Sequence, residues 1–368
     1  MATATPARAV TGYLPNDRPP FVQLILLGFQ HILTMFPATV FVAAFTGFHI
    51  GTVLLGSGIS TVVALILSKR AIGKFIPLYY GSSFSYIAAY LGIAQAMTGS
   101  TPAFGVPLPD NVIQTMQAGI IVTGLINIAI GFLIRAVGKA NLDKVLPPVV
   151  TGSVAAIIGF GLAFAALDLA RNNWGIALLT LLVTVLFSAY LRGFLGMLPV
   201  LLGAIVGYIV SALVVPGSVA LAPVLAAPVF LVPHVTLPAF GGAFIVTAIV
   251  SISIMAIATI PESTAHLYQI SLYVDRFAEE TGREKYHLDQ NIGWNLVFDG
   301  VGDFLHGLVG ATAGTNYGEN NSLMASTRNY SGPALLAAGV IAILLAFVGT
   351  LAELVRSVPL AVTGGLAI

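Results

Sequence analysis

The chain has 368 residues, of which 57% are hydrophobic and 8% are charged. Soluble domains carry about a quarter charged residues, so this composition excludes a soluble globular protein. The formal net charge of +1 gives no reason to expect a nucleic-acid partner, and the lack of cysteine excludes disulfides, thiol catalysis and cysteine metal sites. We therefore interpret the sequence as a polytopic integral membrane protein whose surface contacts lipid.

The chain begins with a polar stretch, "ATATPARAVTGYLPNDRPP", which has no short apolar core followed by a cleavage site. We expect no cleaved signal peptide here and assign residues 1–20 to a cytoplasmic segment. Beyond it, apolar runs of about 20 residues predict membrane-spanning helices. We place them near residues 22–47, 50–68, 112–135, 148–168, 173–191, 196–214, 243–273, 292–311 and 333–352.

Two shorter segments, 76–92 and 313–327, do not fit this pattern. Both begin with small or polar residues and end with apolar ones, which predicts a broken element: extended chain followed by a half-helix. Such backbone persists at membrane depth only where protein or a water-filled cavity satisfies its hydrogen bonds. We therefore expect these two segments to lie inside the protein.

The lysine and arginine positions support both broken crossings. If the N-terminus is cytoplasmic and both segments count as crossings, every basic residue except Arg171 and Arg356 falls on the cytoplasmic side. This is the distribution that the positive-inside rule predicts. Omitting either crossing would invert all later loops.

The two broken segments also resemble each other. Residues 80–83 read Tyr-Gly-Ser-Ser and residues 317–320 read Tyr-Gly-Glu-Asn, while 37–39 (Pro-Ala-Thr) resemble 261–263 (Pro-Glu-Ser). Because seven crossings precede the second copy, the halves would have opposite orientation, as in the inverted repeats of secondary transporters. The second copy is shorter and the chain ends within "SVPLAVTGGLAI". We expect it to lack two or three helices, a shorter natural form being the alternative.

Two acids, Glu262 and Glu319, fall at predicted membrane depth. A charge there costs at least about 2.5–3.5 kcal/mol, so each is expected to be protonated, paired or functional. His266 follows Glu262 by one helical turn. The pair could form a proton site, bind a metal or only pack between helices. A metal needs a third ligand, for which Asp303 and His306 are candidates, but no histidine-rich motif is present. We predict no metal and no cofactor.

Other residues at membrane depth have simpler explanations. His31 could bond a neighbouring helix, and Asp299 and Asp303 are expected to support the core rather than contact substrate. Arg328 lies at the C-terminal end of the second half-helix, where the helix dipole favours a cation. Phe84 begins the apolar half of the first broken element, where an aromatic face beside free backbone N–H groups suits a flat polar heterocycle.

At these residues the sequence resembles the nucleobase–ascorbate transporter family, and most closely its bacterial uracil permease branch. The resemblance runs over nearly the whole chain. It rests on "NDRPPFVQLILLGFQHILTMFPATVFV", "LYYGSSFSYIA", "LPPVVTGSVAAIIGFGLA", "PESTAHL" and "TNYGENNSLMASTR".

The resemblance implies an all-α protein of fourteen segments in two inverted sevens. A core domain would comprise residues 21–140 and 241–356, and a gate domain 141–240 with the start of its second part at 357–368. Substrate would bind between core and gate, where the two broken elements meet. The family also implies proton symport by movement of core against gate, a homodimer, and a place in the bacterial cytoplasmic membrane.

Carried onto this sequence, the resemblance assigns roles to individual residues. Those implied to bind substrate are Glu262, Glu319, Phe84, Ala38, Gly318 and Tyr317. Those implied in proton coupling are Glu262, His266 and His31, and the supporting residues are Asn320, Ser322, Thr327 and Ser83. The chain departs from the family at Pro37 and Ser322, where glycine is usual. Pro37 is expected to kink its helix.

The predicted function is therefore proton-coupled uracil transport, and not an enzymatic activity. The acid in "YGEN" favours uracil, since purine-type relatives more often carry an amide there. Xanthine or urate transport on the same fold remains an alternative. An anion channel or exchanger is the alternative of another class, but it predicts a basic residue at the site, and none lies at membrane depth. An intramembrane metalloenzyme would lack its third ligand.

Overall fold

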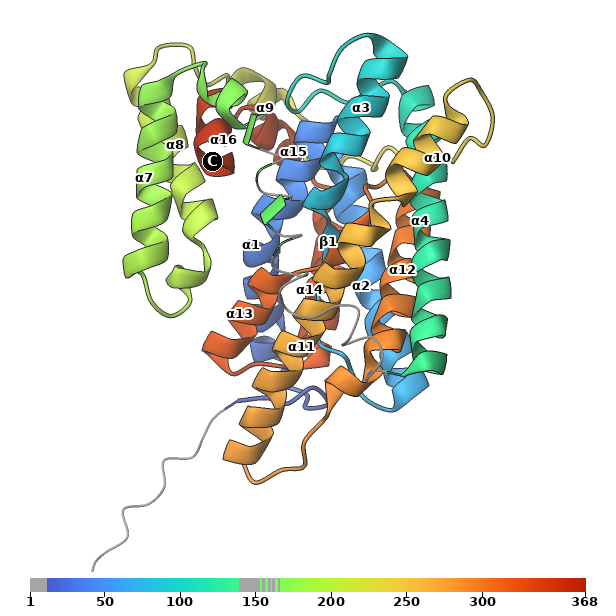
Figure 1. Ribbon diagram of the computed structural model, residues 1–368. Helices are drawn as coiled ribbons and strands as arrows, with labels where there is room; N and C mark the ends of the chain where they lie inside the picture. Colours follow the sequence, from blue (N-terminus) through green and yellow to red (C-terminus); the bar gives the residue numbers. More distant parts are fainter. Residues whose placement is uncertain (1–11, 139–152, 154–155, 158–159, 161–162, 165) are drawn as a thin grey trace, which may run out of the picture.

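The structure is a computed structural model that describes residues 12–138, 153, 156–157, 160, 163–164 and 166–368. The predicted span 148–168 therefore lies largely outside the described residues. Figure 1 shows a bundle of helices with two very short strands at its centre. The elements are α1 (Phe21–Thr46), α2 (Ile50–Ile72), β1 (Tyr80–Ser82), η1 (Phe84–Tyr86), α3 (Ile87–Thr98), α4 (Asp110–Val137), α7 (Trp174–Tyr190), η2 (Leu195–Met197), α8 (Pro199–Val214), α9 (Ala222–Ala226), α10 (Ile245–Ser253), α11 (Ala256–Glu280), η3 (Leu288–Asn291), α12 (Ile292–Val309), β2 (Gly314–Asn316), α13 (Gly318–Thr327), α14 (Gly332–Leu345), α15 (Gly349–Arg356) and α16 (Leu360–Ala367).

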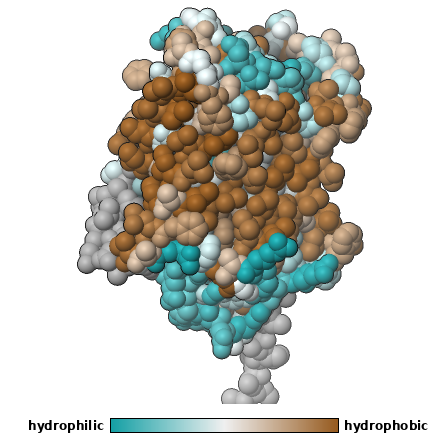
Figure 2. All heavy atoms as spheres, turned by 90° about the vertical axis from the view of Figure 1, so that its right-hand side faces the viewer, coloured by the Kyte–Doolittle hydropathy of each residue, from teal (hydrophilic) through white to brown (hydrophobic). Residues whose placement is uncertain are grey.

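Helices long and apolar enough to cross a membrane are α1, α2, α4 and the α10–α11 run, while α7, α8 and α14 are shorter apolar helices. The surface carries a broad apolar band between hydrophilic ends (Figure 2). Large apolar side chains on α4, such as Phe132 and Leu133, are about half exposed. An apolar belt of this kind is stable against lipid tails, so the fold is that of an integral membrane protein.

The span predicted at 243–273 is present as the α10–α11 run, in which the backbone tightens between the two helices and Met255 N donates to Ile252 O at 3.1 Å. The span predicted as a single helix at 333–352 is divided, and this detail of the prediction was wrong. Between α14 and α15 the chain leaves the helix because it pairs with an extended segment, where Leu231 N donates to Phe347 O at 2.9 Å. By contrast, α1 continues through Pro37 as one helix.

Both predicted broken elements are confirmed as a short strand followed by a helix. The strands β1 and β2 pair antiparallel, with Tyr80 opposite Asn316 and Ser82 opposite Gly314. All six residues of the two strands are buried. The ladder continues beyond them, because Tyr317 N donates to Tyr79 O at 2.9 Å. The two extended segments thus satisfy each other's backbone groups at the centre of the protein.

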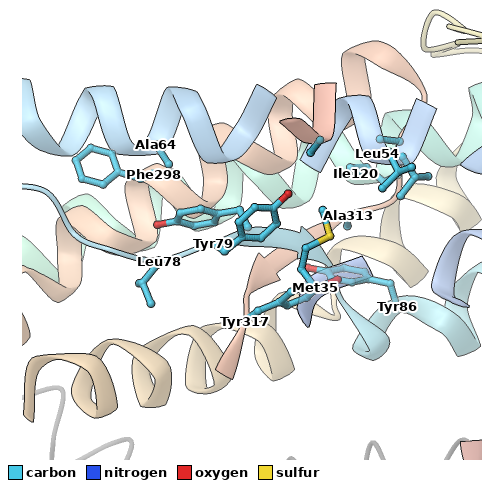
Figure 3. Packing of buried hydrophobic residues seen from close by; sticks show 14 of the residues in the cluster. Met35, Leu54, Ala64, Leu78, Tyr79, Tyr86, Ile120, Phe298, Ala313 and Tyr317 are labelled. Carbon is cyan, nitrogen blue, oxygen red and sulfur yellow. The ribbon is translucent and has the colours of Figure 1, made fainter. Parts of the chain in front are cut away.

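Aromatic side chains fill the space around this central pair of strands. Tyr79 and Tyr86 are fully buried, and the Tyr79 and Tyr317 rings stack with their centroids 6.3 Å apart (Figure 3). The Tyr317 hydroxyl donates to Ser82 O at 2.9 Å and lies 2.9 Å from Thr39 Oγ1. These contacts fix the strands against α1.

Glycines let the surrounding helices approach closely at two crossings. A Cβ on Gly300 of α12 would lie 2.5 Å from Gly124 O of α4, and one on Gly58 of α2 would lie 2.6 Å from Gly339 O of α14. In lipid, such small-residue contacts supply the packing that holds helices together. The α4–α12 and α2–α14 pairs are therefore tightly packed, and α2 also packs against α12.

The helices α7, α8 and α16 form a separate packed group, seen at the left in Figure 1. Its buried apolar cluster comprises Ile176, Ala361 and Val362, and is distinct from the large cluster around the strands.

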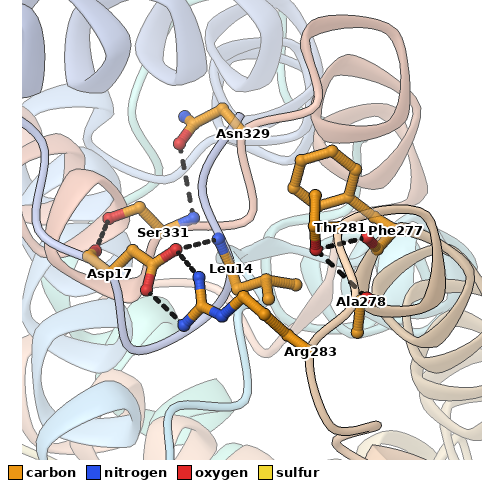
Figure 4. A network of polar contacts seen from close by, with 8 residues as sticks. All are labelled: Leu14, Asp17, Phe277, Ala278, Thr281, Arg283, Asn329 and Ser331. Atoms are coloured by element: carbon orange, nitrogen blue, oxygen red, sulfur yellow. Dashed lines mark hydrogen bonds and ion pairs between the residues drawn. The ribbon is translucent and has the colours of Figure 1, made fainter. Parts of the chain in front are cut away.

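A network of polar contacts joins the N-terminal segment to the chain between α11 and α12 (Figure 4). Both carboxylate oxygens of Asp17 accept from the Arg283 guanidinium, at 2.6 and 2.8 Å, and Oδ2 also accepts from Leu14 N. Ser331 Oγ donates to Asp17 O at 2.7 Å. Partial burial opposes ionisation of Asp17, but the Arg283 and Leu14 hydrogen bonds outweigh it and lower the pKa of this carboxyl below its ordinary value.

We expect Asp17→Asn to destabilise the protein by about 1–2 kcal/mol at neutral pH, because charge-assisted hydrogen bonds are lost at a partly exposed site. Since the pKa of Asp17 is lowered by folding, this contribution is present above about pH 4 and is lost as the pH falls below it. Thermal melts in detergent at several pH values measure the difference. The exposed pair Asp168–Arg171 supplies the control, because Asp168→Asn should leave the melting temperature unchanged.

Candidate functional site

A cavity of about 620 Å³ lies between the helices that surround β1 and β2 and the group formed by α7, α8 and α16. On one side it is lined by α1 and by the starts of the two half-helices, and on the other by α8 and α16. Its lining is mostly apolar and includes Thr34, Pro37, Ala38, Phe41, Phe84, Glu319, Ser322, Leu201, Ile205, Tyr208, Thr363 and Leu366.

Both half-helices begin at this cavity. Ser83 caps η1, its Oγ accepting from Ser85 N at 3.3 Å, whereas Tyr317 gives α13 no side-chain cap. The first N–H groups of a helix have no partner within it and carry the positive end of the helix dipole. The start of α13 is therefore a place where hydrogen-bond donors remain available to a ligand.

Glu319 is in the first turn of α13, and its exposed side chain lines the cavity. A carboxylate is favoured at a helix N-terminus. One turn further on, Ser322 also lines the cavity, and its hydroxyl donates to Gly318 O at 3.1 Å. The serine that replaces the usual glycine therefore turns its hydroxyl back to the helix and adds only a small side chain to the cavity wall.

Aromatic rings form the adjoining part of the wall. Phe84 stacks on Phe41 of α1 with centroids 5.9 Å apart, and Phe41 in turn contacts Phe104 at 6.3 Å. Ala38, one helical turn before Phe41, also lines the cavity. A flat ring could stack here with its edge toward Glu319.

Glu262 and His266 of α11 lie next to this wall, both half-buried. Glu262 Oε2 accepts from Ser85 Oγ at 3.3 Å, and its carboxyl is within electrostatic range of His266 and Glu319. His266 Nδ1 lies 2.7 Å from Asn316 O, a pure acceptor, so Nδ1 carries the proton. His266 Nε2 faces Gly318, because a Cβ built at Gly318 would lie 2.7 Å from it. With the proton on Nδ1, Nε2 is the ring nitrogen that can accept a further proton.

Asparagines lock the second broken element to its neighbours. Asn320 Nδ2 donates to His31 Nδ1 at 3.0 Å and to His31 O at 3.1 Å, which ties α13 to α1. Asn321 Nδ2 donates to His266 O at 2.9 Å, and Asn316 Nδ2 donates to Ser263 Oγ at 2.7 Å. His31 therefore contacts α13 through Asn320.

The predicted site residues fall into three groups. Glu319, Phe84, Ala38 and Ser322 line the cavity, while Glu262, His266, Gly318, Ser83, His31 and Asn320 lie in the layer of contacts around it. The Tyr317 side chain is directed into the strand core instead, where its hydroxyl is already bonded. Thr327, at the far end of α13, bonds Leu323 O at 2.8 Å and is not brought to the cavity.

Asp303, which the sequence predicted to support the core, is bonded to two neighbouring elements. Its Oδ1 accepts from Gly314 N at 2.6 Å and its Oδ2 from Asn127 Nδ2 at 3.1 Å, so it anchors β2 to α4 and α12. His306 bonds Ser60 of α2 at 3.0 Å. Among the described residues, neither joins Glu262 and His266 in a cluster close enough to share a metal.

Two polar residues on the opposite wall of the cavity, Tyr208 and Thr363, were not identified from the sequence.

The sequence matches the Permease family (Xan_ur_permease) over residues 22–368. The chain belongs to this family. Membership of the Permease family makes the protein a transporter rather than an enzyme, and agrees with the apolar helices of an integral membrane protein.

Two uracil permeases are among the curated proteins whose sequences are similar to this Permease family chain. That of Bacillus caldolyticus is 34% identical over 368 residues, covering 96% of this chain and 78% of the relative. That of Escherichia coli (strain K12) is 33% identical over 364 residues, covering 96% and 77%. The putative pyrimidine permease RutG of the same strain is 34% identical over 363 residues, covering 96% and 76%.

Solved structures share the fold at low sequence identity. The transmembrane domain of the cyanobacterium bicarbonate transporter BicA matches with a TM-score of 0.67 at 18% identity, covering 96% of this chain and 89% of that one. The SLC26A9 structure matches with a TM-score of 0.61 at 12% identity, covering 94% and 56%. These likenesses place the Permease family chain in the fold of those transporters.

Proposed function

We propose that this protein is a proton-coupled transporter that binds uracil in the cavity between its two packed helix groups. The relatives named uracil permease support a nucleobase as substrate. The arrangement of the cavity wall supports a planar substrate, because an aromatic face and a polar edge stand side by side.

The observation that carries the proposal is Glu319 at the uncapped start of α13, on the cavity wall. The edge of uracil presents N–H donors next to carbonyl acceptors. A carboxylate accepts from N–H groups, and the free backbone N–H groups of a helix start donate to carbonyls. Both kinds of partner are present within one helical turn, beside the Phe84 ring.

Glu262 and His266 are the groups that we propose to couple a proton to transport. Glu262 bonds Ser85, next to Phe84, and His266 Nε2 faces the first residue of α13. A proton taken up by either group would change the charge directly beside the substrate edge. A bound proton would then change the affinity for substrate, and bound substrate would change the affinity for the proton by the same factor.

The proposed movement is that of a core domain against a gate domain. The core would comprise residues 21–140 and 241–356, and the gate 141–240 with 357–368. The inverted repeat is supported by the antiparallel β1–β2 pair and by the two glycine crossings, α2–α14 and α4–α12, which repeat-related segments would form. The basic residues support a cytoplasmic N-terminus. We extend the family's homodimer and bacterial inner-membrane location to this chain.

Purine transport is the second candidate, because xanthine and urate carry similar N–H and carbonyl groups and the cavity is not confined to a pyrimidine's size. An anion substrate is not favoured, since the described residues that line the cavity include no lysine or arginine.

A ligand panel on purified protein in detergent tests the proposal. We expect uracil to raise the melting temperature in a concentration-dependent way, with smaller or no shifts from xanthine, urate and ascorbate. A shift from xanthine or urate but not from uracil would replace the substrate assignment. No shift from any nucleobase would contradict nucleobase binding at the cavity.

A further inference from the structure

A second cluster of ionisable side chains lies apart from the transport site, at the end of the helix group where α2 and α4 begin. His49 immediately precedes α2, Asp110 is the first residue of α4, and His234 belongs to the extended stretch between α9 and α10. The three residues are far apart in the sequence, so no motif marks them. The fold alone brings them together.

The geometry of the cluster suits shared coordination of one ion. His234 Nε2 lies 2.9 Å from Asp110 Oδ1 and 3.0 Å from Oδ2, and the His49 and His234 rings are 4.4 Å apart at their centroids. One ligand atom from each residue lies within 4.8 Å of those of the other two. Ligands that share a tetrahedral zinc at about 2.0–2.2 Å lie about 3.4 Å apart, a contraction within reach of side-chain rotation.

A separate observation indicates that the cluster is incomplete without a ligand. His49 Nε2 is buried, and it has no hydrogen-bond partner in the part of the chain that the structure describes. A buried polar nitrogen left without a partner costs free energy, which an ion in this position would offset. The His234 and Asp110 side chains are each 51% exposed, so an ion can enter and keep a water as its fourth ligand.

We propose that His49, Asp110 and His234 form a site for a divalent transition-metal cation, with zinc as the best match to two imidazoles and one carboxylate. The ligands are held by bonds to the helices beneath them. His234 O accepts from Thr52 Oγ1 at 2.6 Å. Nearby, Gln117 Nε2 donates to Thr236 O at 2.8 Å. Such surrounding bonds orient ligands before the metal arrives.

The nearby positive charge does not oppose a cation strongly. Arg356 of α15 acts electrostatically on His49, but its guanidinium pairs with Glu353 at 2.5 Å. A bound metal would join the extended stretch to the starts of both α2 and α4. Since this stretch leads from the α7–α8 group to α10, the metal would fasten the connection between the two helix groups, on the external side under the proposed orientation.

A comparable cluster at the opposite end provides the control. Asp275, His287 and Asp289 also lie within metal-binding distance of one another. There, however, Asp275 Oδ1 already accepts from Tyr286 N at 2.7 Å and His287 N at 3.1 Å. This carboxylate is occupied in holding a loop, and we assign no metal to it.

The experiment is a Zn²⁺ titration of the full chain, purified in detergent without a histidine tag, followed by a competing chelator dye. We expect one Zn²⁺ per chain, weakened at least tenfold by His49→Gln, Asp110→Asn or His234→Gln and unchanged by His287→Gln. Melts without metal confirm that each variant is folded, and Zn²⁺ should raise the melting temperature of the wild type and of His287→Gln but not of the three site variants.

A folded His49→Gln variant that binds Zn²⁺ as the wild type does would overturn the assignment, as would the loss of binding in His287→Gln alone. Failure of the wild type to bind Zn²⁺ at micromolar concentration would also overturn it. None of these outcomes depends on uracil binding, so the metal proposal and the transport proposal fail independently.

Discussion

Replacing Glu319 with alanine is expected to weaken uracil binding by about 10- to 150-fold, because a hydrogen bond to a charged group contributes about 1.5–3 kcal/mol. The side chain lines the cavity at the start of α13, so its loss removes an acceptor without disturbing the buried strands. Glu319→Gln should have a smaller effect, since an amide oxygen still accepts one hydrogen bond. Isothermal titration with uracil measures both.

Glu279→Ala is the matched control for this result. Glu279 is an exposed acid, 58% accessible, that pairs with Lys285 at the end of α11, away from the cavity. It should bind uracil as the wild type does. If Glu319→Ala binds uracil within twofold of the wild type, Glu319 does not contact the substrate and the proposed binding mode is wrong.

Gly300→Ala is expected to destabilise the protein by about 1–3 kcal/mol, a large effect for a single methyl group. The added Cβ would lie 2.5 Å from Gly124 O and 2.7 Å from Ile128 N, both backbone atoms that cannot move without displacing α4 from α12. Because α12 also carries Asp303, which anchors Gly314 of β2, uracil binding should weaken as well. Thermal melts and uracil titrations detect the two effects.

The control for this prediction is Gly92→Ala on α3. Beyond its own helix backbone, the part of the chain that the structure describes places no atom within 4 Å of a Cβ built at Gly92, so the added methyl meets open space. Alanine has the better helix propensity, so the variant should be as stable as the wild type or more so, by up to about 1 kcal/mol. Equal destabilisation by Gly92→Ala and Gly300→Ala would show that the crossing is not the cause.

The sequence predicted the broken elements well because their composition is unusual for membrane depth. Small and polar residues before an apolar half indicated a strand followed by a helix at 76–92 and 313–327, and both are present. The division within 333–352 could not be predicted. It depends on tertiary backbone pairing, that of Leu231 with Phe347, which leaves no local pattern.

The candidate site was predictable to the extent that its residues carry costly or distinctive chemistry. Glu319 and Glu262 were found because acids are rare at membrane depth. A supporting role was expected for Asp303, but its partners Gly314 and Asn127 could not be predicted, because they meet it only in three dimensions. The wall opposite Glu319 was missed for another reason, since Tyr208 on α8 looks like any other residue of an apolar helix.

The central claim, proton-coupled uracil transport, is tested most directly by uptake of labelled uracil into proteoliposomes with an imposed pH gradient. With one proton per uracil, each pH unit supplies about 1.4 kcal/mol and should support about tenfold accumulation. Glu262→Gln should abolish this gradient dependence, whereas Glu279→Gln should retain it. Uptake that is indifferent to the gradient in the wild type, or full gradient-driven uptake by Glu262→Gln, would contradict the account.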